Sequence, residues 1–235
     1  MLRYIDSTKM GRARHGWLDS HFHFSFAEYY NPDNIQFGVV RVINDDIIQP
    51  GTGFDMHPHK DMEIISYVVE GSLSHKDSMG NEHTIDRGHV QYMSAGTGVF
   101  HSEHNWSTKP MRLIQMWILP NKKGLTPSYG DYRFEFDDRI STWMPIATST
   151  DNAKSSAPIK IHADVNVYAS FIAAGESIDF KVGPGRQAYL VQLEGKSTVN
   201  NVELSERDAL EIIEEDISIT ASTESHFYII EMQRS

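Results

Sequence analysis

The 235-residue sequence contains no cysteine, which excludes disulfides, thiolate metal ligands and a cysteine nucleophile. Its longest apolar runs are only about half a dozen residues, too short for a membrane-spanning helix. The residues that follow Met1 lack the apolar core of a secretory signal peptide. We therefore expect a cytoplasmic protein with no membrane partner.

Clusters of basic residues are also missing. Lys and Arg number 21 against 32 Asp and Glu, which gives a formal net charge of −11, and the basic residues are scattered along the chain. A protein that binds nucleic acid directly needs a basic surface to contact the phosphate backbone. We therefore expect no direct nucleic-acid partner. A protein partner stays open, although no segment marks a docking surface.

Helical periodicity is rare in the sequence, whereas short β-type segments recur. Ile64–Val69 and Met111–Leu119 are two of them, and turn signals separate such segments about every ten residues. This pattern is typical of a β-sandwich or β-barrel. The three residues Asn44 to Asp46 are predicted to form one of the turns. The sequence thus predicts an all-β fold with few, short helices.

The strand pattern is interrupted once, between residues 121 and 158, and resumes at Ile159. We therefore expect two domains, 1–130 and 131–235, with the boundary somewhere in 121–158.

The two parts of the sequence resemble each other around a Glu-Gly pair. A strand-like segment ends at Glu70-Gly71 in the first part and at Glu194-Gly195 in the second. Aligning these glycines places Lys181 and Gly183 opposite two histidines of the first part, His57 and His59. The repeat predicts a duplicated β-domain in which only the first copy can hold a histidine-based metal site.

Two pairs of metal-binding residue types lie about forty residues apart, His57-Pro-His59 and His101-Ser-Glu103. Residues two positions apart on a strand point to the same face. Each pair can therefore direct two ligands to one point, and two facing strands would supply four. Three imidazoles and one carboxylate suit a divalent first-row metal ion.

The spacing of one His-x-His pair is weak evidence on its own, because 12 histidines in 235 residues give roughly 0.6 such pairs by chance. His21 and His23 form another pair, but nothing near them completes a site, so we expect a structural role. His75, His83 and His89 lie in a polar segment and are expected to be solvated.

The surroundings of the first pair make the signal specific, because they resemble the two cupin motifs. Gly51, His57, His59, Glu63 and Gly71 fit the first motif, with seven residues instead of six before the last glycine. Gly88, Gly96, His101 and Asn105 fit the second, with Ser94 in place of proline and four residues instead of two before the histidine.

These departures match one branch, the pirin family. The pattern His-Pro-His-x3-Glu, followed by Tyr-Val-x-Glu-Gly and Ser-Ala-Gly-x-Gly-x-x-His-Ser-Glu, resembles pirins. The segments at 15–20, 41–46 and 115–120 also resemble pirin signatures. The resemblance implies two cupin domains in tandem, a bicupin, with metal ligands only in the first.

The resemblance also implies the identity of the ligands and an activity. The ligands would be His57, His59, His101 and Glu103, with Glu63 outside the metal's coordination shell. Bacterial pirins of the quercetinase type cleave flavonols such as quercetin with O2, so we expect such a substrate. Fe(II) is the expected metal, although Mn, Ni, Cu, Zn or Co suit the same ligands. Glu103 would also serve as the catalytic base.

Two other functions stay open at this stage. Eukaryotic pirins imply a non-enzymatic metal-binding redox sensor that partners a transcriptional regulator. A cupin isomerase or hydrolase would use the ion as a Lewis acid without O2. For any of these, Phe37, Val39, Phe54 and Met56 could line an apolar pocket over the metal, or pack in the core.

Overall fold

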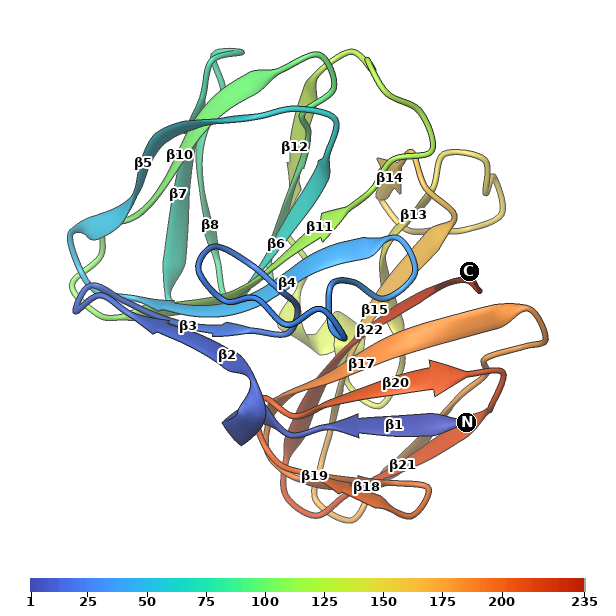
Figure 1. Ribbon diagram of the computed structural model, residues 1–235. Coiled ribbons are helices and arrows are strands. Elements are labelled where there is room, and N and C mark those ends of the chain that lie inside the picture. The colour runs from blue at the N-terminus through green and yellow to red at the C-terminus, as the bar shows by residue number, and fades with distance from the viewer. Residues whose placement is uncertain (235) are drawn as a thin grey trace. The chain divides into compact units, whose positions relative to one another are not determined.

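The computed structural model describes residues 1–234, and nearly all of its regular structure is β-strand (Figure 1). Within this range the helices are two short 3₁₀ segments, η1 (Ser7–Lys9) and η2 (Phe136–Arg139). No helix of the described part is long and apolar enough to cross a membrane. The predicted all-β fold with few helices is confirmed.

The chain forms two compact units. The N-terminal unit comprises Gly11–Glu135 together with Ile161–Ala163, and the C-terminal unit comprises Met1–Met10, Phe136–Lys160 and the residues from Asp164 onward. The chain passes from the N-terminal to the C-terminal unit after Glu135. The first ten residues, which precede the N-terminal unit in the sequence, belong to the C-terminal unit.

The N-terminal unit contains two antiparallel sheets, shown in blue to green in Figure 1. The larger sheet has the strand order β12 (Ser128–Tyr132), β9 (Val90–Ser94), β6 (Glu63–Glu70), β11 (Met111–Ile118), β4 (Val40–Ile48), β3 (Leu18–Phe22), β2 (Gly11–Arg14). The smaller sheet has the order β5 (Thr52–His59), β10 (Val99–Asn105), β7 (Ser72–Asp77), β8 (Glu82–Asp86).

The C-terminal unit repeats this arrangement. Its larger sheet has the order β1 (Leu2–Ile5), β20 (Ala209–Ile213), β17 (Arg186–Glu194), β22 (Ser225–Gln233), β15 (Val165–Ile172), β13 (Met144–Ser149), β14 (Ile159–Ile161). Its smaller sheet has the order β16 (Ser177–Phe180), β21 (Ile217–Ala221), β18 (Ser197–Val199), β19 (Val202–Leu204). The β17-β18 corner corresponds to the β6-β7 corner, so the predicted duplication appears as equivalent strand orders.

The equivalence explains why the first residues belong to the C-terminal unit. Strand β1 pairs with β20 at the sheet edge, where β12 pairs with β9 in the other unit. The C-terminal copy thus takes its edge strand from the beginning of the chain. No local pattern in the first ten residues reveals this pairing, because β-pairing joins segments far apart in sequence.

The repeated Glu-Gly pair marks a corner where only glycine fits. Gly71 and Gly195 both adopt a positive φ, of 79° and 83°. A Cβ at Gly71 would lie 2.8 Å from the Cβ of Met111, and one at Gly195 would lie 2.0 Å from the carbonyl oxygen of Glu224. Both the backbone angle and the close approach therefore require glycine.

The predicted turn at Asn44 to Asp46 is wrong, because these residues lie inside strand β4. Asp45 is fully buried and forms a two-pronged ion pair with the Arg112 guanidinium, with N–O distances of 2.9 and 2.6 Å. The Asp46 carboxylate, also buried, accepts a hydrogen bond from the Ser20 hydroxyl. These partners stabilise the acidic groups inside a sheet, which their turn propensity alone does not reveal.

A β-bulge sets the geometry of β5 against β10. His101 is opposite His57, but Glu103 is opposite Phe54, so Asp55 and Met56 together face a single residue of β10. The bulge changes the alternation of β5 by one residue. As a result, Phe54 and His57 face the same side despite their three-residue separation.

Gly53 allows β5 to approach β10 at this bulge. A Cβ at this position would lie 2.2 Å from the carbonyl oxygen of Glu103 and 2.5 Å from the Cα of His104. Both contacts are with the backbone, so no side-chain rotation can relieve them.

Gly53→Ala should therefore lower the free energy of unfolding by about 1–3 kcal/mol, through overpacking against the neighbouring strand. Urea denaturation measures this change. Gly130→Ala is the matched control, because Gly130 also lies in a strand of this unit and a Cβ there meets nothing within 4 Å. Equal stability of the two variants would contradict this explanation of the β5–β10 contact.

Candidate functional site

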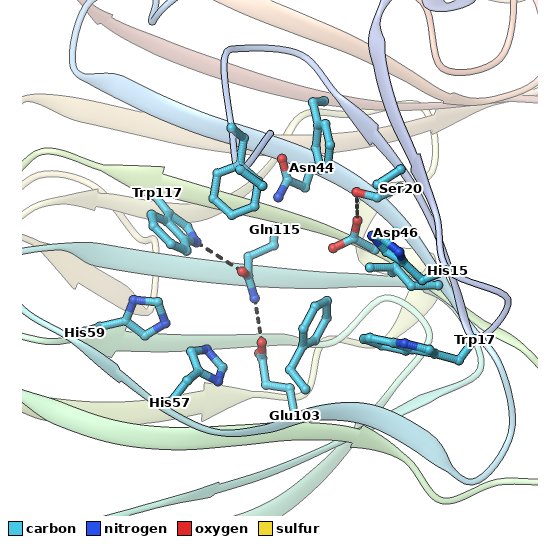
Figure 2. Close-up of a pocket in the computed structure, with 16 residues that line it drawn as sticks. His15, Trp17, Ser20, Asn44, Asp46, His57, His59, Glu103, Gln115 and Trp117 are labelled. Atoms are coloured by element: carbon cyan, nitrogen blue, oxygen red, sulfur yellow. Dashed lines mark hydrogen bonds between the residues drawn. The ribbon is translucent and has the colours of Figure 1, made fainter. Parts of the chain in front are cut away.

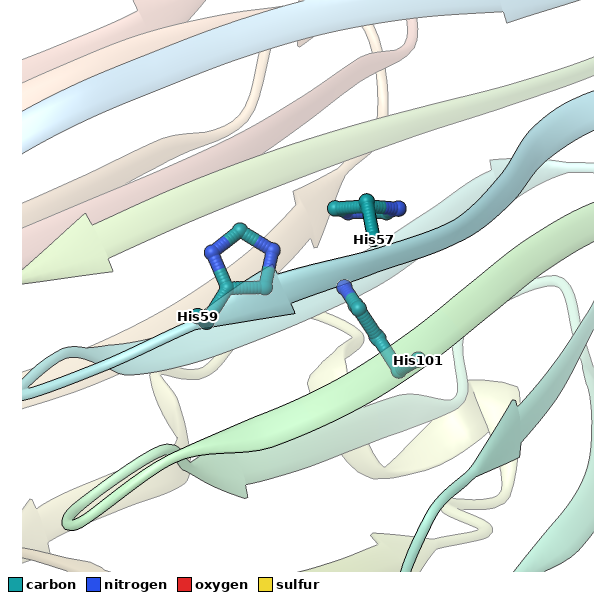
Figure 3. Close-up of side chains that lie close together, drawn as sticks. All are labelled: His57, His59 and His101. Atoms are coloured by element: carbon teal, nitrogen blue, oxygen red, sulfur yellow. The ribbon is translucent and has the colours of Figure 1, made fainter.

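Three histidines predicted from the sequence lie together on β5 and β10 (Figure 3). The ring centroids are 4.8 Å apart for His57 and His59, 4.5 Å for His57 and His101, and 4.8 Å for His59 and His101. Each ring offers a nitrogen, and these nitrogens lie within 4.8 Å of one another. The antiparallel register produces the triangle, because His57 and His101 are opposite each other and His59 lies two residues along the same face.

The free nitrogens of this triangle fit a metal ion. Nε2 of His59 and Nε2 of His101 are buried and have no hydrogen-bond partner. Nδ1 of His57 lies 2.7 Å from the Asp55 carbonyl oxygen, so it donates its proton there and leaves Nε2 as the ring's lone-pair atom. Buried polar atoms rarely stay unpaired, and a shared cation would satisfy all three nitrogens.

The protonation state of two rings also suits metal binding. Burial, and then the neighbouring imidazoles, lower the pKa of His59 to about 4 and that of His101 to about 3. Both rings are therefore neutral near pH 7. A neutral imidazole is the form that binds a metal.

Glu103 lies on the same strand as His101 and is held by a row of polar side chains from the larger sheet. Its Oε1 accepts hydrogen bonds from the Ser66 hydroxyl, at 3.2 Å, and from the Gln91 amide. Its Oε2 accepts from the Gln115 amide, at 2.7 Å. Ser66 pairs with Gln91 on one side and with Gln115 on the other, so the three donors form a line across β9, β6 and β11.

The carboxylate of Glu103 is therefore oriented from the opposite sheet. Each carboxylate oxygen has two lone pairs. Both positions of Oε1 are taken, whereas Oε2 keeps one position free. The orienting residues were not predicted from the sequence. Ser66 and Gln115 are each a lone polar residue inside an apolar strand segment, a pattern that can indicate a buried polar partner.

His101 belongs to a second group of close ligand atoms, together with His75 and Glu103. The expected solvation of His75 is wrong, because this ring is buried and stacks on Tyr129 with centroids 4.3 Å apart. Its Nε2 lies 3.2 Å from the Asp77 carboxylate, and its Nδ1 lies 3.5 Å from Nδ1 of His101. This Asp77–His75–His101 chain directs Nε2 of His101 toward the histidine triangle.

Glu63 occupies a separate buried pocket of hydrogen bonds. Its carboxylate accepts from the Tyr92 hydroxyl at 2.5 Å and from the Ser94 hydroxyl at 2.9 Å, and it lies 3.2 Å from Nδ1 of His162. Neither group of close ligand atoms includes it. All of its partners are thus structural side chains of the N-terminal unit.

A cavity of about 340 Å³ opens beside the histidines (Figure 2). His57, His59 and Glu103 line one part of it. Its walls are mainly apolar and aromatic: Trp17, Leu18, Phe22, Phe26, Phe54 and Trp117. Both the volume and the lining are typical of a small-molecule site.

Of the four residues considered for the apolar pocket, only Phe54 lines the cavity. Phe37 is buried in the core, while Met56 is half exposed because it lies in the β-bulge. Trp117, by contrast, packs edge-on against the ring of His59, with centroids 4.8 Å apart, and its indole N–H donates to Gln115.

Another part of the cavity is polar. Asn44, Asp46 and Ser20 line it, and Asn44 is the next member of the polar row, paired with Gln115 across β11 and β4. Burial, with a smaller contribution from the nearby Asp45 and Glu103 carboxylates, raises the pKa of Asp46 to about 7. The hydrogen bond from Ser20 opposes this shift.

The C-terminal unit has the same strands but a different interior. Strands β16 and β21, which correspond to β5 and β10, contribute Phe180, Ile217 and Ile219 to an apolar core. Within residues 1–234, all groups of three or more close metal-ligating side chains lie in the N-terminal unit. The fold and the site thus define a double cupin with one candidate metal centre.

Comparisons with known proteins identify the family. The pirin family model matches residues 5–118, and the model described as the quercetinase C-terminal cupin domain matches residues 146–232. A quercetin 2,3-dioxygenase of Escherichia coli K12 is 40% identical over 99% of both chains. A pirin-like protein of Caulobacter vibrioides is 41% identical over 95% of this chain and 96% of its own.

A solved structure agrees with this result. The bacterial pirin YhhW of Escherichia coli, in complex with nickel(II), is 38% identical, covers 100% of both chains and superposes with a TM-score of 0.92. The chain belongs to the pirin family. The resemblance stated from the sequence motifs is confirmed.

The lowered histidine pKa values predict an acid-sensitive metal-free protein. Unfolding returns the pKa of both rings to about 6.5. Below that pH, the unfolded chain therefore binds protons that the folded chain does not. The free energy of unfolding should therefore fall as the pH drops from about 6.5 toward 4, and these rings should have no effect above 6.5.

Thermal melts of chelator-treated protein across this range measure the effect. His101→Gln should show a shallower decline than the original chain, whereas His83→Gln, which alters a half-exposed ring, is the control and should keep the original slope. Equal slopes for all three proteins would contradict the assigned protonation states.

Proposed function

We propose that this protein is a metal-dependent dioxygenase that cleaves a flavonol such as quercetin with O2. Its single metal site would use His57, His59, His101 and Glu103. The observation that carries the proposal is the triangle of imidazoles, with buried and unpaired nitrogens, at one part of an aromatic cavity. The names of close relatives, which include quercetin 2,3-dioxygenase, support the substrate class.

The cofactor would be one divalent transition metal ion. The chemistry of the ligand set and the nickel(II) complex of a relative both support this class of ion. We propose Fe(II) as the native metal. When bound, a redox-capable ion would supply Lewis acidity and electron transfer toward O2, with positions left open for substrate.

The protein residues have separate tasks in this proposal. Nε2 of each histidine faces the shared centre, and the Asp55 carbonyl and the Asp77–His75 chain fix the orientation of two of the rings. Oε2 of Glu103, the oxygen with a free lone-pair position, would have two roles, one at a time: metal ligand before substrate binds, and acceptor of the flavonol hydroxyl proton when it binds. Gln115 would hold that oxygen in place.

The cavity would position the substrate and exclude water. Trp17 and Phe54 contact each other edge to face, with ring centroids 5.2 Å apart, and Phe26 and Trp117 do the same at 5.3 Å. Such pairs give a rigid aromatic lining suited to a planar ligand. A dry wall also strengthens the hydrogen bonds made at Glu103.

Glu103→Gln should reduce flavonol turnover at least about 100-fold, because the amide cannot accept the substrate proton. Turnover should fall even in preparations that retain a full complement of metal, measured by elemental analysis. Glu70→Gln, at an exposed position on β6, is the control and should keep full activity. Unchanged turnover at full metal occupancy would remove Glu103 from the mechanism.

Anaerobic reconstitution tests the function as a whole. The chelator-treated protein is loaded separately with Fe(II), Mn(II), Ni(II) or Cu(II), then given quercetin and O2 while O2 uptake is recorded. At least one metal should support uptake, and His101→Gln should abolish it through loss of a ligand. No uptake with any of the metals would reject the proposal and favour a sensing role or another substrate.

A further inference from the structure

The cavity beside the histidines has polar side chains in two regions. In Figure 2, His57 and His59 lie well apart from Asp46 and Ser20, with the Gln115 side chain between them. The metal site accounts for the first region. Nothing in the proposed metal chemistry uses the second.

Asn44 contributes an amide group to the second region. Its side chain is only 4% exposed, and its Oδ1 is buried without a hydrogen-bond partner. Its neighbours in the polar row, Gln115 and Ser66, are both engaged with Glu103 or with each other. Oδ1 has no surface open to the cavity that Asn44 lines, so the amide nitrogen is the atom that a ligand can reach.

Asp46 supplies a second acceptor. Its Oδ1 accepts from the Ser20 hydroxyl, which fixes the orientation of the carboxyl group, and its Oδ2 accepts from no residue of the described chain. The side chain lines the cavity while being only 3% exposed overall. Above pH 7, where the carboxyl group is ionised, Oδ2 is thus a fixed acceptor in a largely dry environment.

The chemistry of this region favours a hydrogen-bond donor. No Lys or Arg is among the described residues that line the cavity, and Asp45 lies directly behind Asp46 in the strand. An anionic group such as a carboxylate or phosphate would find no Lys or Arg there, and it would lie close to the Asp46 carboxyl group; His15, drawn beside Asp46 in Figure 2, is the lining side chain that can be cationic. A neutral hydroxyl can donate its one proton to Oδ2 of Asp46 while its oxygen accepts a hydrogen bond from the Asn44 amide N–H.

We propose that Asp46, Asn44 and Ser20 form a subsite that binds a phenolic hydroxyl of the substrate, remote from the oxygens held at the metal. The subsite makes the enzyme specific for polyhydroxylated aromatic compounds. This inference rests on the proposed function for the identity of the substrate. The subsite itself is defined by the cavity and its polar side chains alone.

Two pairs of probes test the subsite in protein loaded with Zn(II), which has no redox chemistry. Quercetin and 3-hydroxyflavone share the chelating oxygens, but only quercetin has hydroxyls elsewhere. Phenol and toluene have nearly the same size, but only phenol can donate a hydrogen bond. Dissociation constants are measured by titration calorimetry or ligand-observed NMR.

The original chain should bind the hydroxylated member of each pair about tenfold more tightly, as expected for one hydrogen bond to a buried acceptor. Asp46→Leu should remove most of this preference and leave the affinity for toluene unchanged or improved. Asn44→Leu should reduce the preference as well, and it serves as the second variant if Asp46→Leu does not fold. Asp86→Leu, on the exposed strand β8, is the control and should keep the preference.

The outcomes separate the subsite from the enzyme function. If the phenol preference depends on Asp46 while no flavonol binds, the subsite stands and the flavonol substrate is rejected. If flavonols bind and turn over but Asp46→Leu and Asn44→Leu keep the original preferences, the subsite is rejected and the function stands. Equal affinity of the original chain for both members of each pair would also overturn the subsite.

Discussion

The antiparallel pairing of β5 and β10 is the interaction on which the site depends. It places His57 opposite His101, so two strands supply three imidazoles to one point. The bulge between them then turns Phe54 to the same side as the histidines, which adds an aromatic wall to the metal-binding face. The close approach of β5 to β10 at Gly53 is part of the same arrangement, because a side chain there would separate the two strands.

The larger sheet of the N-terminal unit contributes polar side chains to the site from its interior face. Gln91, Ser66, Gln115 and Asn44 form a continuous polar row across four strands, where a sandwich normally buries apolar side chains. Three of them satisfy Glu103, so the cost of burying these groups is offset by mutual hydrogen bonds. The fourth reaches the remote part of the cavity.

The C-terminal unit has the same topology but a different interior. Its strand order is equivalent, yet Phe180, Ile217 and Ile219 fill the place of the metal-binding face. Duplication therefore preserved the corner glycines and the sheet order, while one copy kept polar side chains and the other an apolar core. The two units therefore differ in their interior side chains and not in their fold.

The all-β class, the duplication and the family follow from the amino-acid sequence, because strand alternation, the Glu-Gly corners and the spacing of His57, His59 and His101 are local patterns. The sequence also indicated Glu103 through the family resemblance. Only the tertiary structure decided that β1 completes the C-terminal sheet, that His75 is buried behind His101, and that Asn44 and Asp46 lie inside a strand facing a cavity. These facts depend on pairing between segments far apart in the chain. A polar residue that finds its partner across a sheet has the same local pattern as one that faces solvent.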